Sequence, residues 1–204
     1  MSTRLFLAAA LVALGASAQA QTTPMRSGGY DASRPSWLPY TQNGYVGLNV
    51  GRPSYRTGCG SAAFACDDPS ASLHLYAGGL FNPYFGLEVG YLHMGDADRG
   101  GGTTRAQGLN FSLLGRVPVG SMFSVFGKLG TTYGRTSTST SASAGSGIAT
   151  GKDSGWGESY GLGLSADLGS NWSAVLEWQR HRFHFAGNNK EAVRTTSLGV
   201  KYRF

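Results

Sequence analysis

The chain closes on a stretch in which apolar and polar residues alternate strictly, "SLGVKYRF" at residues 197–204. One side of an extended chain would carry Leu198, Val200, Tyr202 and Phe204. Alternation of this kind predicts a β-strand with two unlike faces. In a soluble sandwich the apolar face would pack in a core, whereas in a membrane barrel it would face lipid and the polar face would line the lumen. The remainder of the sequence has to separate these two cases.

The other end of the chain has the features of a secretory signal peptide. Met1–Arg4 is short and basic, Leu5–Gly15 is an apolar run, and Ala18-Gln19-Ala20 has the small-x-small form of a cleavage site. We therefore expect residues 1–20 to be removed on export. No later stretch contains the roughly 18 consecutive apolar residues that a transmembrane helix needs.

The composition favours an all-β protein. After removal of the signal, about 184 residues remain, enough for one domain. The 32 glycines, 12% aromatic residues and 14% charged residues are unusual for a soluble helical protein and suit twisted strands. The formal charge of +6 is dispersed and forms no basic cluster among aromatics, so we expect no nucleic-acid partner.

The alternating pattern recurs along the chain. Residues 21–43 contain three prolines and no periodicity, and are expected to form an N-terminal tail on the periplasmic side. Eight strands are expected in the domain that follows, 44–204: 44–52, 73–81, 84–95, 105–119, 123–135, 156–168, 172–185 and 193–204. An even number of strands lets an antiparallel barrel close without a free edge.

Loop lengths and aromatic residues favour the membrane barrel. The connections after the second, fourth and sixth strands are expected to be short, and those after the other strands long, as in barrels of the outer membrane. Aromatic residues collect near strand ends: Tyr84, Phe123, Trp172, Tyr202 and Phe204 at one end, and Tyr133, Trp156 and Phe183 at the other. These would form two interfacial girdles. A soluble sandwich or lipocalin-like barrel stays open, because alternation alone does not distinguish lipid from core.

The segment "FNPYFGLEVGYLHMG" (81–95) resembles the OmpA-type transmembrane-barrel family, and the likeness resumes at 108–119, 128–130, 176–180 and 197–204. It implies an all-β, eight-stranded antiparallel transmembrane barrel in the Gram-negative outer membrane. It also implies that Tyr202 and Phe204 carry the signal read by the barrel-assembly machinery. Larger members continue into a peptidoglycan-binding domain, and this sequence stops at Phe204, so we expect no such anchor.

Alternation directs six charged side chains into the lumen: Glu88, Arg116, Lys128, Asp167, Glu177 and Lys201. Side chains fill the interior of an eight-stranded barrel, so buried charges have to pair. The resemblance places Glu88, Lys128 and Glu177 at lumen positions of the family, whereas two of its basic positions are Leu114 and Val175 here. Two hypotheses follow, a structural network that plugs the lumen and a narrow or gated ion path.

Cys59 and Cys66 lie in the first long loop. In an oxidising compartment they are expected to form a disulfide, the alternatives being free thiols or bonds to other chains. No histidine at ligand spacing accompanies them, so we expect neither a metal nor a cofactor site.

Arg180, His181 and Arg182 lie near the outer end of the seventh expected strand. They are candidates for contact with the phosphates of lipopolysaccharide in the outer leaflet. A lipid A hydrolase would need a serine, a histidine and an acid there. Known enzymes of that class carry a His-x-Ser motif on one strand. The likeness fails here, because His184 is followed by Phe185-Ala186, so we expect no enzyme.

Residues 136–151, "TSTSTSASAGSGIATG", are expected to form a surface loop because they contain almost no apolar mass. The sequence therefore predicts an integral outer-membrane barrel that serves envelope integrity and contacts a host or cell-surface ligand through its long loops, in the manner of an adhesin. The alternatives are an ion pore and, less well supported, a lipid A modifying enzyme.

Overall fold

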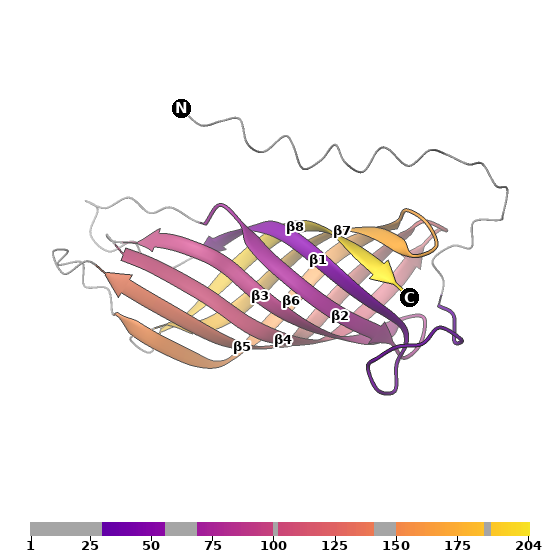
Figure 1. Cartoon of the computed structure of the whole chain (residues 1–204), viewed down its shortest axis with the longest axis horizontal. Coiled ribbons are helices and arrows are strands. Elements are labelled where there is room, and N and C mark those ends of the chain that lie inside the picture. The colour runs from indigo at the N-terminus through magenta and orange to yellow at the C-terminus, as the bar shows by residue number, and fades with distance from the viewer. Residues whose placement is uncertain (1–29, 56–68, 100–101, 141–149, 186–188) are drawn as a thin grey trace, which may run out of the picture.

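The computed structural model describes residues 30–55, 69–99, 102–140, 150–185 and 189–204, which form a closed antiparallel β-barrel (Figure 1). Its strands are β1 Gln42–Tyr55, β2 Ser72–Leu80, β3 Phe85–Arg99, β4 Gly102–Val119, β5 Phe123–Thr140, β6 Gly151–Asp167, β7 Trp172–Phe185 and β8 Asn189–Arg203. The eight strands confirm the predicted fold class. Within these residues there is no helix long and apolar enough to cross a membrane.

Each strand pairs with the next in sequence, and β8 closes the barrel against β1. In that closing ladder Leu198 lies opposite Val50, and Val200 lies opposite Leu48. The strand quoted from the end of the sequence is thus paired on both sides, to β7 and to β1. Closure removes the unpaired edges that an open sheet would expose.

The two faces of the wall differ in the way alternation predicts. Leucines such as Leu129 and Leu198 are more than 60% exposed on the outside, whereas the adjacent Lys128 is buried inside. A continuous outer surface of large apolar side chains is suited to lipid, and the polar interior is typical of an outer-membrane barrel.

Aromatic residues ring the outer surface at two levels. Trp172 and Tyr202 pack against each other at the end with short turns, with ring centroids 4.9 Å apart. Tyr133 and Trp156 pack against each other nearer the other end, with ring centroids 5.2 Å apart. The assignment of Phe183 to a girdle is wrong: its side chain is fully buried in the lumen. It lies an even number of residues from Glu177 on β7, so the two side chains share the inner face.

The short connections, 81–84, 120–122 and 168–171, lie at one end of the barrel, called here the turn end. At the opposite, loop end, the strands run further than predicted: β5 continues to Thr140 and β6 begins at Gly151. The expectation that residues 136–140 belong to a loop is therefore wrong, because they pair with β4 and in part with β6.

The connection between β3 and β4, expected to be long, is likewise mostly strand, and Asp96 and Arg105 form a two-pronged ion pair across it. The connection between β7 and β8 is also shorter than expected, because β8 begins at Asn189. Cys59, Cys66 and the predicted signal peptide lie outside the described residues.

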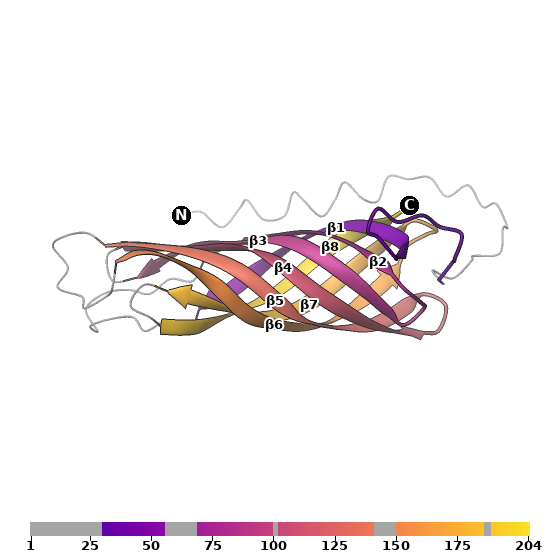
Figure 2. The ribbon, with the colours of Figure 1, turned by 90° about the horizontal axis from the view of Figure 1, so that it is seen from below.

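Residues 30–41 carry no regular strand and fold against the turn end, where the C-terminus also lies (Figures 1 and 2). The Tyr30 hydroxyl donates a hydrogen bond to the carbonyl oxygen of Phe81, 3.2 Å away. The Arg34 guanidinium reaches the carbonyl of Ser170 at 3.5 Å. This segment therefore joins the β2–β3 turn to the β6–β7 turn beneath the barrel mouth.

Candidate functional site

The lumen is built in layers that follow from the order of side chains along each strand. An apolar cluster lies toward the loop end and contains Leu92, Met94, Ala97, Ala106, Phe183 and Val193. A second lies toward the turn end and contains Tyr45, Tyr76, Leu80, Leu114, Phe126 and Val175, with Tyr30 packed against it. Along β7 the inward residues run from Val175 through Glu177 and His181 to Phe183, so the polar layer lies between the two clusters.

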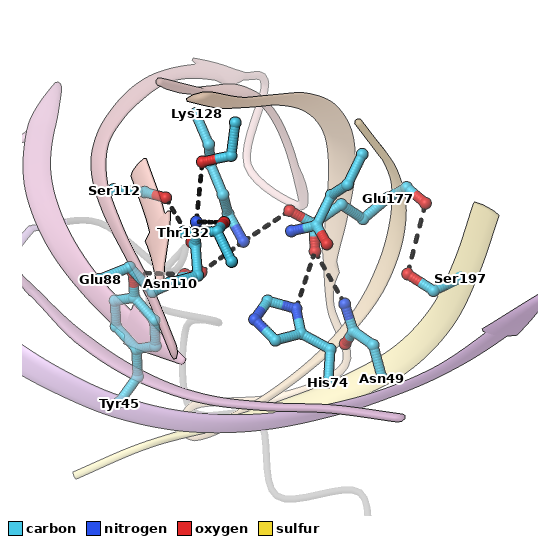
Figure 3. Close-up of polar contacts among 12 residues, drawn as sticks. Tyr45, Asn49, His74, Glu88, Asn110, Ser112, Lys128, Thr132, Glu177 and Ser197 are labelled. Atoms are coloured by element: carbon cyan, nitrogen blue, oxygen red, sulfur yellow. Dashed lines mark hydrogen bonds and ion pairs between the residues drawn. The ribbon is translucent and has the colours of Figure 1, made fainter. Parts of the chain in front are cut away.

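Lys128 is at the centre of that polar layer. Its Nζ lies 2.6 Å from Glu88 Oε1 and 2.6 Å from Glu177 Oε1, and all three side chains are almost completely buried. The ammonium reaches from β5 to a carboxylate on β3 and another on β7 (Figure 3). Each of these charges thus has a partner on another strand, which offsets the cost of removing it from water.

Other side chains surround the two carboxylates. The Tyr45 hydroxyl donates to Glu88 at 3.2 Å, and the Asn49 amide donates to Glu177 at 2.9 Å. His74 Nδ1 lies 3.9 Å from the same carboxylate as Asn49 (Figure 3). The Lys128 ammonium also lies over the face of the Tyr76 ring, 4.8 Å from its centroid, in a cation–π contact.

A chain of hydrogen bonds between uncharged side chains continues the polar layer toward the loop end. The Asn110 amide donates to Thr132 and to Ser159, and it accepts from Ser112. The Thr132 hydroxyl is 2.9 Å from His181 Nδ1, whose other ring nitrogen lies near Gln179. These bonds link four strands across the interior, since Asn110, Thr132, Ser159 and His181 lie on β4, β5, β6 and β7.

The other three predicted lumen charges lie apart from this centre, toward the turn end. Asp167 pairs with Arg203 at 3.0 Å and accepts a hydrogen bond from Ser173. Arg116 donates to Ser124, and the Lys201 ammonium lies 5.2 Å from the Tyr45 ring centroid. The six predicted residues therefore form a central group and a turn-end group. One cavity is lined by members of both, Glu88 and Lys128 from the first and Arg116 and Lys201 from the second.

Glycines on the inner face let large side chains cross the lumen. A Cβ added at Gly47 would lie 2.2 Å from the Tyr76 ring, and one at Gly134 would lie 2.2 Å from the Phe183 ring. Both distances are far below van der Waals contact, so a side chain at either position would force the ring to move. At these two positions glycine thus allows close packing of the interior.

The outer basic residues are separated by the alternation of β7. Arg180 and Arg182 lie on the outward face, where Arg182 pairs with Glu158 at 2.8 Å and Arg180 donates to the Tyr160 hydroxyl. His181 is only 1% exposed and faces the lumen, so its assignment to contacts with lipopolysaccharide is wrong. Neighbours in sequence lie on opposite faces of a strand.

Tyr202 and Phe204 lie on the outer surface at the turn end, and both are partly exposed. The Phe204 backbone amide donates to the carbonyl of Gly44. The last residue is thereby attached to the first strand of the barrel.

Sequence reasoning missed Asn49, His74, Arg203 and the lumen position of His181. Period two was enough to find them: His74 alternates with Leu73 and Leu75, and Arg203 follows Lys201 by two residues. The partners of each charge were not predictable in this way, because they depend on the side chains that meet across the barrel.

The family model described as "Outer membrane protein beta-barrel domain" matches residues 6–204 of the chain. Comparison with curated proteins finds no match. Among solved structures, the chain is similar to Neisserial surface protein A (NspA), with a TM-score of 0.61 at 14% identity, covering 79% of this chain and 97% of that one. It is also similar to the N-terminal β-barrel domain of Pseudomonas aeruginosa OprF, with a TM-score of 0.55 at 14% identity, covering 80% and 99%. At these identities the two likenesses establish the fold.

Proposed function

Because this chain belongs to the outer membrane protein beta-barrel domain family, we propose that it is a closed barrel of the Gram-negative outer membrane that supports envelope integrity and surface contacts. The observation that carries this proposal is the layering of the lumen, in which one apolar cluster lies on each side of the central group of Glu88, Lys128 and Glu177. A passage through the barrel would have to cross both clusters.

The lumen favours a structural role over conduction. Phe183 and Val193 are fully buried at the loop-end layer, and Leu92 and Met94 are buried beside them. An ion that entered this layer would lose its hydration and would meet no charged partner within the apolar cluster, which costs several kcal/mol. The segment 30–41 adds a further obstruction at the turn-end mouth.

The outer parts of the molecule are then available for contacts. In the proposed orientation the turn end faces the periplasm and the loop end faces the outside, as in other outer-membrane barrels. Strands that continue past the Tyr133–Trp156 level would present the loops to a cell-surface ligand in the manner of an adhesin. Arg180 and Arg182 face outward toward the lipid and its lipopolysaccharide, and the terminal Phe204 with Tyr202 would be read by the barrel-assembly machinery.

The position of His181 excludes this residue as the base of an enzyme that modifies lipid A. Its two ring nitrogens lie near Thr132 and Gln179 inside the lumen, away from the lipid. It is therefore not placed to act as a base on an outer-leaflet substrate.

Deletion of the gene in the source bacterium tests the envelope role. We expect greater sensitivity to sodium dodecyl sulfate and to large antibiotics that an intact outer membrane excludes, restored by the wild-type chain. A chain lacking Phe204 would serve as the matched control, because it should fail both to assemble and to restore resistance. Unchanged sensitivity in the deletion strain would contradict the proposal.

A gated ion path is the second candidate, and one observation favours it: Lys128 lies at the same 2.6 Å distance from two carboxylates. An ammonium shared in this way could exchange partners and open a polar route. Glu88→Gln and Glu177→Gln would then change the size or frequency of current steps in a planar bilayer. Absence of steps in both variants and in the wild type would exclude this candidate.

A further inference from the structure

Three arginines face outward on neighbouring strands at the seam where the barrel closes. They are Arg52 on β1, Arg180 on β7 and Arg194 on β8, and we call them the seam arginines. Arg180 and Arg194 are direct partners in the β7–β8 ladder. Arg52 lies opposite Thr196 and is therefore the diagonal neighbour of Arg194 across the β1–β8 ladder.

This arrangement is unfavourable in the chain by itself. Side chains directly opposite in an antiparallel pair have Cβ atoms about 5 Å apart, and like charges in such positions destabilise the sheet. Repulsion is stronger beside lipid than in water, since the low dielectric screens less. The seam thus concentrates three positive charges that repel one another.

No acidic side chain among the described residues forms an ion pair with any of the three. The nearby acid Glu158 is already paired, with Arg182 at 2.8 Å. Arg180 contacts only the Tyr160 hydroxyl and ring among the interactions of the described part of the chain. The Nε atoms of both Arg180 and Arg194 are shielded from solvent and have no hydrogen-bond partner within the protein.

The level of the seam arginines matches the outer lipid–water interface. Arg180 lies eight residues along β7 from the girdle residue Trp172. At about 3.3 Å per residue and a tilt near 40°, this is a height of roughly 20 Å, close to the upper edge of an apolar band about 25 Å tall. The aromatic pair Tyr160 and Trp178 packs beside Arg180, and Leu176 and Leu198 face the lipid below.

We propose that the seam arginines form a binding site for a phosphate group of the phosphorylated glycolipid in the outer leaflet, lipid A. One phosphate placed between Arg180 and Arg194 would accept hydrogen bonds from both guanidinium groups, and Arg52 would complete its charge balance. The acyl chains would then lie along Leu176 and Leu198. This inference deepens the proposed contact with lipopolysaccharide and rests on the proposed outward orientation of the loop end.

Native mass spectrometry of the full refolded barrel with lipid A tests the site. Arg180→Gln/Arg194→Gln is expected to weaken the lipid A adduct by at least about tenfold, because two charge-assisted contacts are lost. The matched control is Arg105→Gln/Arg135→Gln, which also removes two outward arginines, one from β4 and one from β5, and should change binding less than about twofold. Equal losses in the two variants would overturn the site, since binding would then reflect diffuse charge.

A second measurement, of stability, distinguishes phosphate on lipid A from free phosphate. Its result does not depend on whether the barrel conducts ions. In micelles of an alkyl glycoside detergent, which carries no phosphate, Arg194→Gln should raise the denaturant midpoint, because it removes repulsion. With lipid A added, the same substitution should lower the midpoint relative to the wild type. A midpoint that shifts in the same direction with and without lipid A would overturn the proposal. If inorganic phosphate stabilised the barrel as much as lipid A does, the assignment of the site to a lipid would be overturned. Ion currents through the barrel would contradict the proposed closed lumen but not the phosphate site.

Discussion

Charged side chains on the two sides of the barrel wall differ in whether they have a partner of opposite charge. Inside, Lys128 is held between Glu88 and Glu177 at 2.6 Å from each. Outside, beside the seam where the barrel closes, Arg180 and Arg194 face one another with no acidic partner in the described part of the chain. The inner charges have partners of opposite sign within the protein, whereas these two outer charges have none.

The largest expected effect comes from removing the cation of the inner group. Lys128→Met would leave two carboxylates buried without a cation, and should lower the free energy of unfolding by about 3–5 kcal/mol. Urea titration of the barrel folded in lipid vesicles measures this loss. The triple variant Glu88→Leu/Lys128→Met/Glu177→Leu should recover most of it, because the uncompensated charges are gone. A loss below about 1 kcal/mol for the single variant would show that the lumen is hydrated.

A charge added to the outer wall within the lipid should cost less but still be measurable. Leu198 lies midway along β8 between Tyr202 and Arg194, near the middle of the apolar band. Leu198→Arg should lower the free energy of unfolding by about 2–4 kcal/mol in the same vesicles. Leu198→Gln, which removes the same apolar side chain but adds no charge, is the matched control and should cost less than Leu198→Arg. Equal costs of the two substitutions would contradict the placement of Leu198 in lipid.

A smaller effect tests the close packing of the loop-end apolar layer. Gly134→Ala would place a Cβ 2.2 Å from the Phe183 ring, and should cost about 1–3 kcal/mol of stability. In a Phe183→Ala background the same change should be nearly neutral, since the ring is absent. Additive effects of the two substitutions would mean that the ring does not press against β5.

The sequence was sufficient to predict the strands and their faces, because each strand separates lipid from lumen and so alternates at period two. It was less informative where residues were grouped by sequence proximity. Grouping by proximity assigns His181 to the outer surface with Arg180 and Arg182, and Phe183 to a girdle with other aromatic residues near strand ends. Alternation along β7 directs both into the lumen.

The partners within the lumen required the structure. Lys128 and Glu177 are far apart in sequence, and their contact depends on the shear of the barrel and on which side chains lie between. The position of residues 30–41 beneath the mouth was also not predictable, because it rests on backbone hydrogen bonds such as that from Gly44 to Pro35. Strand ends at the loop end were missed because Ser and Thr carry no apolar pattern.

Single-channel recording of the refolded wild-type barrel tests the closed lumen most directly. With folding verified by a shift in gel mobility between unboiled and boiled samples, we predict no current steps in a planar bilayer. A variant in which Phe126 and Phe183 are both replaced by alanine, one from each apolar cluster, supplies the comparison in which the obstruction is reduced. Reproducible current steps from the wild type, carried by small ions, would contradict the closed lumen and support the gated ion path.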